Sequence, residues 1–238
     1  MAVGAGQCRL AIDSRAKERT RFPHCGQGRG GVTQALMTSQ FEVKQIEFVR
    51  SATRPEEFPP DDLPMVGFAG RSNVGKSSLL NTLANRKRLA IVSSTPGRTR
   101  LLNFYLVNKA LYFVDLPGYG FARVAKSEQA RWEAMVTCFV ERNPRLCVMV
   151  TLFDVRRQLE EDDRALLDWL EYHGVPIIAV LTKADKLGRG AQLQALRQME
   201  KALVPWQPRA VLLFSALKRQ GREELLELIG QLAFEKNG

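Results

Sequence analysis

The sequence has few of the residues and segments that mark several common protein classes. Its 238 residues include four cysteines, Cys8, Cys25, Cys138 and Cys147, without CxxC spacing or paired histidines nearby, so we expect no structural metal. No apolar run approaches the ~20 residues of a membrane span. The N-terminal segment lacks the apolar middle of a secretory signal. We therefore expect a protein of a reducing compartment, the cytoplasm, with no membrane partner.

Positive charge is what the chain has in excess. Lys plus Arg number 35 against 25 for Asp plus Glu, a formal net charge of +10. Such a balance favours a partner that carries phosphates, nucleic acid first, although charge scattered over the surface would give the same total. The position of the basic residues along the chain has to decide between these interpretations.

Residues 1–40 differ from the rest of the chain. They are basic and poor in acids, contain the flexible stretch "GQGRGG" and show no periodic apolar positions. An organellar transit peptide has this composition, and it would move the expected location from the cytoplasm to an organelle. We favour a disordered basic extension, or a start codon assigned upstream of Met37. We expect residues 41–238 to form the folded domain.

From Phe41 onward, short apolar segments alternate with segments of helical periodicity. This alternation predicts an α/β domain with a mostly parallel six-stranded sheet and helices on both faces. The hairpin-length turn "NK" between two strands adds one antiparallel edge strand, and nothing in the pattern calls for more than a monomer. The expected strands are 64–70, 101–107, 110–116, 146–155, 175–185 and 210–216, and the expected helices are 76–86, 127–142, 160–174, 191–203 and 222–236.

The stretch "GRSNVGKSS" has the composition of a phosphate-binding loop. Gly70, four residues, then Gly75, Lys76 and Ser77 match its spacing, between a strand and a helix. Glycines let the backbone approach an anion, and the amides at the start of the helix point at phosphates. Lys76 supplies a charge for the β and γ oxygens, and the Ser77 hydroxyl is a direct ligand for Mg²⁺.

Two later stretches distinguish guanine from adenine. In "TKAD", the Asp185 carboxylate can accept hydrogen bonds from both N1–H and the 2-amino group of guanine, whereas adenine would present a lone pair. The stem of Lys183 can lie against the base. In "SAL", which starts at Ser215, the Ala216 amide can donate to guanine O6. The sequence thus predicts GTP and GDP as ligands.

Two further stretches are expected to sense the third phosphate. In "DLPGYG", Asp115 is placed to hold Mg²⁺ through water, and the Gly118 amide can donate to the γ-phosphate, a contact that hydrolysis removes. In "STPGRTR", the Thr99 hydroxyl can ligate Mg²⁺ directly when GTP is bound, with Thr95 as the main alternative and Ser93 and Ser94 as weaker ones. Two switch loops are the expected consequence.

These stretches in this order are typical of a Ras-like P-loop GTPase domain. "GRSNVGKSSLLNTL", "STPGRTRLLNFY", "FVDLPGYGFA" and "LTKADKL" closely resemble the EngB (YihA/YsxC) family of the TrmE–Era–EngA–EngB–septin group, over residues 41–236. Thr182 stands where many other GTPases have asparagine, as it tends to in EngB-like proteins. Motifs and resemblance together assign the nucleotide contacts to Gly70, Arg71, Ser72, Asn73, Val74, Gly75, Lys76, Ser77, Ser78, Gly97, Thr99, Asp115, Gly118, Thr182, Lys183, Asp185, Ser215 and Ala216.

The resemblance implies slow GTP hydrolysis and a role in assembling the large ribosomal subunit, with a need in cell division and septation. The precursor of that subunit, or its RNA, would then be the partner. Residues 86–100 hold five basic residues and no acidic one, which agrees with an RNA contact, although arginines that are solvated or that neutralise the nucleotide would give the same pattern. A GTPase that regulates a cell-division or membrane complex without touching RNA would have the same nucleotide chemistry. A metabolic P-loop kinase is disfavoured by "TKAD" and "SAL".

Hydrolysis lacks an obvious catalytic side chain. Many Ras-like proteins place a glutamine after the glycine of "DxxG" to orient the attacking water, and here that position is Tyr119. We therefore expect slow intrinsic hydrolysis and no catalytic role for Tyr119. Asn73 stands where potassium-activated relatives carry a cation-ligating asparagine, so K⁺ is a candidate cofactor. A role for Asn73 in stabilising the loop turn is the alternative.

Overall fold

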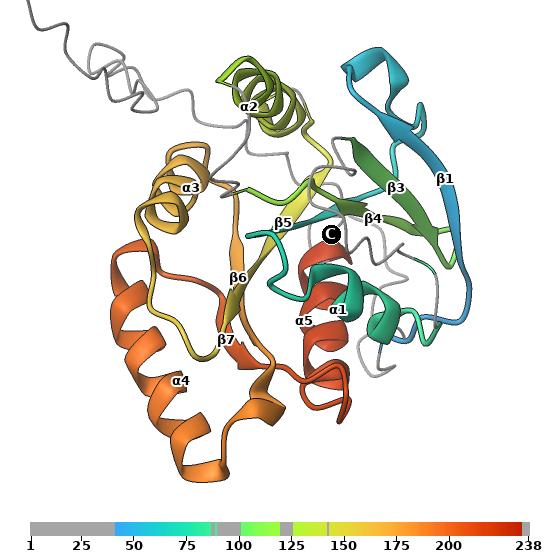
Figure 1. Ribbon diagram of the computed structural model, residues 1–238. Helices are drawn as coiled ribbons and strands as arrows, with labels where there is room; N and C mark the ends of the chain where they lie inside the picture. Colours follow the sequence, from blue (N-terminus) through green and yellow to red (C-terminus); the bar gives the residue numbers. More distant parts are fainter. Residues whose placement is uncertain (1–40, 87–88, 90–100, 120–125, 142, 235–238) are drawn as a thin grey trace, which may run out of the picture. The chain divides into compact units, whose positions relative to one another are not determined.

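A computed structural model describes residues 41–86, 89, 101–119, 126–141 and 143–234. The predictions about residues 1–40 fall outside this part of the chain. The described strands form one sheet in the order β1-β3-β4-β2-β5-β6-β7, with helices on both of its faces (Figure 1). The strands are β1 (Ile46–Ala52), β2 (Met65–Gly70), β3 (Leu102–Val107), β4 (Leu111–Asp115), β5 (Leu146–Asp154), β6 (Ile177–Thr182) and β7 (Ala210–Leu213).

All five predicted helices are present. Their periodic apolar residues face the sheet. The first turn of α3 holds three acidic residues, whose negative charge is stabilised by the partial positive charge at the N-terminus of a helix. Short 3₁₀ turns flank β1, β6 and α4, at Pro55–Glu57 (η1), Ala184–Lys186 (η2) and Val204–Trp206 (η3). The helices are α1 (Lys76–Leu83), α2 (Lys126–Glu141), α3 (Glu161–Tyr172), α4 (Arg189–Leu203) and α5 (Arg222–Phe234).

The sheet has one strand more than the six that the sequence predicts. β1 pairs antiparallel with β3, which in turn pairs antiparallel with β4, while the remaining neighbours are parallel. The prediction of an antiparallel strand is confirmed, but its position at the edge is wrong, because β1 covers β3. The hairpin turn is as predicted, since Asn108 and Lys109 both adopt positive φ, the geometry of a two-residue turn between antiparallel strands.

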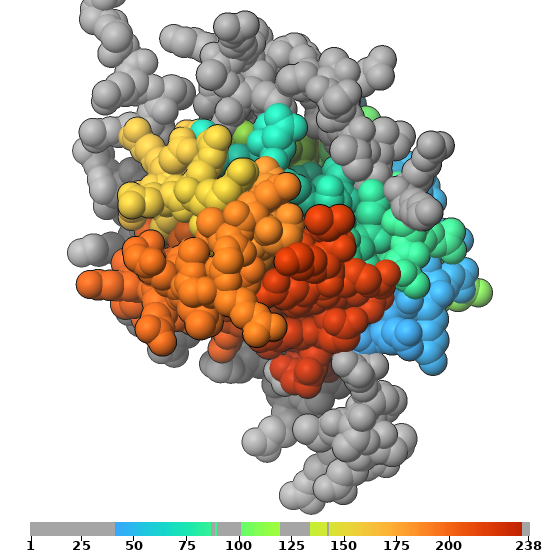
Figure 2. Space-filling model, turned by 60° about the horizontal axis from the view of Figure 1, so that its bottom comes forward, coloured from blue at the N-terminus to red at the C-terminus, as the bar shows by residue number. Residues whose placement is uncertain are grey.

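The core lies in two apolar layers, one on each face of the sheet. Leu79, Leu225 and Ile229 from α1 and α5 pack on one face, and Phe139 and Leu167 from α2 and α3 pack on the other. β5 is buried along its whole length, as expected of a central parallel strand. Figure 2 shows the C-terminal segment, in red, adjoining the segment that contains α4, in orange.

The parallel strands place their carboxyl ends along one edge of the sheet. The phosphate-loop sequence follows β2, "LPG" follows β4, "KAD" follows β6 and "SAL" lies just after β7. Ligands of open α/β sheets bind at this edge, so the fold brings the predicted motifs together. Among the described helices, none is long and apolar enough to cross a membrane.

Candidate functional site

The loop between β2 and α1 has the backbone of an anion cradle. Gly75 adopts φ of 110°, a conformation that a residue with a Cβ rarely adopts, and it precedes the first residue of α1. The first α-helical hydrogen bond runs from the Leu79 amide to the Gly75 carbonyl at 2.9 Å. The amides of the first turn of α1 are therefore oriented outward from the helix end, where a phosphate would accept from them.

Lys76 and Asp115 form an ion pair at the bottom of this cradle. Their side chains are almost fully buried, with 10% and 5% of their surface exposed. Two residues that the sequence assigns to phosphate and to Mg²⁺ thus lie next to each other, although Lys76 begins α1 and Asp115 ends β4. The cation of Lys76 and the anion of Asp115 neutralise one another in this arrangement.

The loop after β4 packs directly on the phosphate-loop backbone. The Ser72 amide donates to the Tyr119 carbonyl at 3.1 Å, and the Tyr119 amide donates to the Gly70 carbonyl at 3.4 Å. A Cβ on Gly118 would lie 2.9 Å from the Ser72 hydroxyl and 3.2 Å from its amide nitrogen. A side chain at position 118 would therefore crowd the phosphate loop and displace Ser72.

Tyr119 is anchored on its other side by α3. Its hydroxyl donates to the Asp163 carboxylate at 2.8 Å, and both side chains are buried. Burial, reinforced by the negative charge of Asp163, raises the pKa of Tyr119 far above its usual value, so the phenol remains a donor. Asp163 also accepts from the Glu160 amide at 2.9 Å, and Arg71 pairs with Glu160 at 2.9 Å. The start of α3 thus supports both loops.

Residues of "TKAD" hold the phosphate loop from the opposite side. The buried Thr182 hydroxyl lies 2.6 Å from the Val74 carbonyl and 3.0 Å from the Phe153 carbonyl, and Lys183 donates to the Asn73 carbonyl at 2.8 Å. The contacts to Val74 and Asn73 each span more than a hundred residues of sequence. The segment predicted to read the base therefore also fixes the turn that is predicted to bind phosphate.

Asp154, at the end of β5, is a buried carboxylate that the sequence motifs do not include. The Arg156 guanidinium binds both of its oxygens, at 2.9 and 2.7 Å, and Lys183 lies 3.0 Å away. The hydrogen bonds from Arg156 hold the pKa of Asp154 well below its usual range, against the opposing effect of burial. Asp154 therefore stays ionised and orients Lys183.

Asp185 and Ser215 meet at the ends of β6 and β7, as the predicted base site requires. The Ser215 hydroxyl donates to one Asp185 oxygen at 2.7 Å, and the Ala184 amide donates to the Phe214 carbonyl at 3.0 Å. The Asp185 side chain is 10% exposed, which keeps it in one orientation. The carboxylate and the start of "SAL" thus form a single polar surface.

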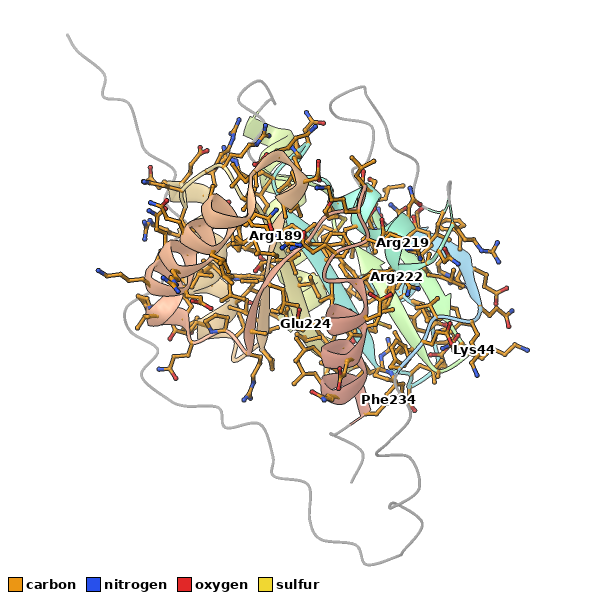
Figure 3. All side chains as sticks on the ribbon, turned by 90° about the horizontal axis from the view of Figure 1, so that it is seen from below. Lys44, Arg189, Arg219, Arg222, Glu224 and Phe234 are labelled. Atoms are coloured by element: carbon orange, nitrogen blue, oxygen red, sulfur yellow. The ribbon has the colours of Figure 1, made fainter. Side chains whose placement is uncertain are left out.

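Arg222 connects this surface to α1. Arg222 is the first residue of α5 (Figure 3). Its guanidinium donates to the carbonyls of Thr82 and Leu83, at 2.9 and 3.0 Å, at the last residues of α1. A cation there is favourable because the C-terminus of a helix carries partial negative charge. One helix therefore has its N-terminus in the phosphate loop and its C-terminus capped from the segment that follows "SAL".

The predicted first switch lies outside the described residues, and with it Gly97, Thr99 and the alternative Thr95. The sequence reasoning also missed residues that the structure places around the site. Each is a common polar residue outside the recognised motifs, and Asp163 and Arg222 contact partners far away in sequence, so no local pattern identifies the set. They are Asp154, Arg156, Asp163, Gln192, Gln220 and Arg222.

The residues present are compatible with a magnesium ion held together with a nucleotide. Within the described part of the chain no cluster of three His, Cys, Asp or Glu side chains could hold a metal alone. Mg²⁺ needs no such cluster, because it keeps several waters and binds through one or two protein oxygens plus phosphates. Ser77, in the first turn of α1, and the carboxylate of Asp115 are oxygen donors of this kind.

Comparison with known proteins gives the family. Residues 65–183 match the family described as 50S ribosome-binding GTPase. The EngB GTP-binding protein of Syntrophus aciditrophicus is 48% identical to this chain, and the match covers 79% of this chain and 95% of the relative. The EngB protein of Geobacter sulfurreducens is 45% identical, and the match covers 77% of this chain and 88% of the relative.

Solved structures agree on the fold. A crystal structure of a probable GTP-binding protein EngB has a TM-score of 0.57 at 24% identity, and covers 72% of this chain and 99% of its own. Aquifex aeolicus Era, bound to GDP and AlF₄⁻, has a TM-score of 0.58 at 27% identity over 71% of this chain and 56% of its own. With its Ras-like sheet, its phosphate loop and these relatives, the chain belongs to the EngB family of GTP-binding GTPases.

Proposed function

We propose that this GTPase acts as a nucleotide-dependent switch in the assembly of the large ribosomal subunit and is needed for normal cell division and septation. The supporting observation is the match of residues 65–183 to a family described as 50S ribosome-binding GTPase. The net charge of +10 agrees with an RNA partner. In this proposal the precursor of the large subunit, or its RNA, is the partner of a monomeric protein in the cytoplasm.

Each side chain of the site has a definite task in this proposal. Lys76 leaves its pairing with Asp115 to contact the β and γ phosphates, which the amides of the α1 N-terminus also bind. Asp185 accepts from the two donors of guanine, and Ser215 orients it. Bound Mg²⁺ would neutralise phosphate charge, held by the hydroxyls of Ser77 and Thr99 directly and by Asp115 through water.

The switch in this proposal is the loop that contains Gly118. It lies on the phosphate loop through the Ser72–Tyr119 contact, so its position is sensitive to any group that enters between them. A γ-phosphate accepting from the Gly118 amide would hold the loop in one position, and hydrolysis would release it. The partner would distinguish GTP from GDP by this difference.

Cosedimentation with purified large ribosomal subunits tests the proposal. We expect the full chain to sediment with the subunits in the presence of a non-hydrolysable GTP analogue and to remain in the supernatant with GDP. Binding should weaken steeply with salt, as contacts to phosphates do. Replacing Arg98 and Arg100 with alanine should weaken binding and flatten its salt dependence while sparing GTP affinity.

A matched variant separates the effect of Arg98 and Arg100 from the effect of lowering the net charge of the protein. Arg189→Ala with Arg197→Ala removes the same charge from α4, where both residues are exposed. This pair should leave cosedimentation unchanged. Nucleotide-independent binding, or none at any salt concentration, would contradict the proposal and favour the alternative, a GTPase that regulates a cell-division or membrane complex without RNA contact.

A further inference from the structure

Gln192 lies in the first turns of α4 and uses its whole amide group in hydrogen bonds. Its Nε2 donates to the Ala184 carbonyl at 2.9 Å and to the Leu187 carbonyl at 3.0 Å. Its Oε1 accepts from Gln220 Nε2 at 3.2 Å. Only the NH₂ side of an amide can donate to two carbonyl oxygens, so the orientation of Gln192 is fixed and its oxygen is left for Gln220.

The partners of Gln192 belong to two different loops of the site. Ala184 begins and Leu187 directly follows the 3₁₀ turn η2, which carries Asp185. Gln220 follows "SAL", and its carbonyl accepts from the Ser215 amide at 3.1 Å. A single side chain, itself outside every nucleotide motif, therefore joins the turn that presents the carboxylate to the loop that presents the serine.

The contact between Asp185 and guanine depends on how η2 lies relative to the "SAL" loop. A carboxylate accepts from two neighbouring donors only when both of its oxygens lie in the plane of the base. Ser215 fixes one Asp185 oxygen through its hydroxyl, but the backbone of η2 decides where the other oxygen lies. A shift of η2 relative to "SAL" would break one of the two contacts to the base and leave the other.

We propose that Gln192 is a positioning residue for guanine recognition: it holds η2 against the "SAL" loop so that Asp185 accepts from both donors of the base. This inference rests on the proposed role of Asp185. Gln192 does not touch the base in this proposal. It acts through the Ala184 and Leu187 carbonyls, and through Gln220 on the other loop.

Selectivity between guanine and hypoxanthine tests this role, because hypoxanthine lacks the 2-amino group. Dissociation constants for GDP, inosine diphosphate and ADP can be measured on the full chain by displacing a fluorescent GDP analogue. Gln192→Leu keeps the approximate shape and loses all three hydrogen bonds. Gln192→Glu keeps an acceptor for Gln220 but directs a carboxylate at two carbonyls. We expect both to narrow the preference for GDP over inosine diphosphate by about three- to tenfold.

Gln194→Leu is the matched control, since Gln194 is exposed on the same helix. It should leave all three dissociation constants unchanged. ADP affinity should stay the same in every variant, because the shift affects only the donors specific to guanine. Gln220→Ala removes one of the three hydrogen bonds and should narrow the preference for GDP over inosine diphosphate less than Gln192→Leu does. This variant still tests the inference if Gln192→Leu does not fold.

Two results would overturn the inference. One is an unchanged ratio between GDP and inosine diphosphate in Gln192→Glu and Gln220→Ala. The other is an equal loss of affinity for all three nucleotides, which a purely structural role would cause. Asp185→Asn in the same series separates this inference from the function on which it rests. If Asp185→Asn keeps wild-type GDP affinity, the base-reading role of Asp185 and the inference about Gln192 both fail. If Asp185→Asn loses GDP affinity while Gln192→Glu keeps the wild-type ratio between GDP and inosine diphosphate, only the role of Gln192 is rejected.

Discussion

The hydroxyl of Tyr119 and the carboxylate of Asp163 form a buried hydrogen bond of 2.8 Å between the loop after β4 and the start of α3. The same tyrosine exchanges backbone hydrogen bonds with the phosphate loop through Ser72 and Gly70. Many Ras-like proteins have a water-orienting glutamine at this position, whereas the tyrosine here holds the loop in place. That Tyr119 has no catalytic role stays a prediction.

Tyr119→Phe should lower the free energy of unfolding by about 1–2 kcal/mol, because Asp163 loses a donor in a buried position. The ring and its packing are retained, so the effect belongs to the hydroxyl. Urea unfolding measures it, and Tyr172→Phe is the control, since Tyr172 on α3 is 61% exposed. Equal unfolding midpoints for wild type and Tyr119→Phe would contradict the anchoring role.

Thr182→Val should weaken GDP binding several-fold in addition to lowering stability. Valine has the same shape, but it leaves the Val74 carbonyl without the donor that fixes the phosphate loop. Titration with GDP measures the affinity. Thr151→Val is the matched control, because Thr151 is also buried and lies 3.4 Å from a strand carbonyl, Ile178, away from the loop. If both variants lose affinity equally, general destabilisation explains the result.

Sequence reasoning predicts the site motifs because their chemistry restricts residue types over a few neighbouring positions. Gly75 has to adopt positive φ, and Asp185 follows a strand at the edge where ligands bind. The supports of the site have no such signal. Asp163 lies 44 residues from Tyr119, and Arg222 lies 140 residues from Thr82. Only the folded chain shows that these common polar residues meet.

β1 escaped prediction for a related reason. Its residues 47–50 are exposed in succession, and its register with β3 shifts between Phe48 and Arg50. An edge strand with a bulge does not show the alternation that identifies a half-buried strand. Of the six predicted strands, β2, β4, β5 and β6 are buried along their whole length, β3 is joined to β4 by a turn with a clear signature, and β7 is a short apolar run. The sequence therefore predicts the apolar strands and the hairpin better than the exposed strand β1.

Asp154→Asn should make stability less dependent on pH in the acid range. The folded-state pKa of Asp154 lies below its ordinary unfolded value of about 4, mainly because of Arg156. The stabilisation is therefore complete above about pH 4 and is lost as pH falls toward the folded pKa. The variant should be about 2 kcal/mol less stable at pH 7, with the difference shrinking below pH 4. Urea unfolding from pH 7 to pH 3 measures this, and a constant difference would contradict the assignment.

Asn73, in the phosphate loop, is the residue to which the sequence ties a K⁺-dependent activation of hydrolysis. Its backbone adopts φ of 62°, its carbonyl accepts from Lys183, and its side chain is exposed. Asparagine tolerates this left-handed conformation better than most residues, which alone would explain its presence. The alternative is that its amide oxygen ligates K⁺ near the β–γ bridge, where a cation would act in place of an arginine finger.

Glycine separates the two roles of Asn73, because it keeps the left-handed turn and removes the amide, whereas alanine would also strain the backbone. We expect GTP hydrolysis by the wild-type protein to be about tenfold faster in KCl than in NaCl at equal ionic strength. Asn73→Gly should remove this difference without weakening GDP binding. Single-turnover hydrolysis of both proteins in the two salts decides the matter. If the wild-type protein hydrolyses GTP equally fast in KCl and NaCl, Asn73 serves only to form the turn. The charge that develops on the phosphates would then have to be neutralised by a group from a partner.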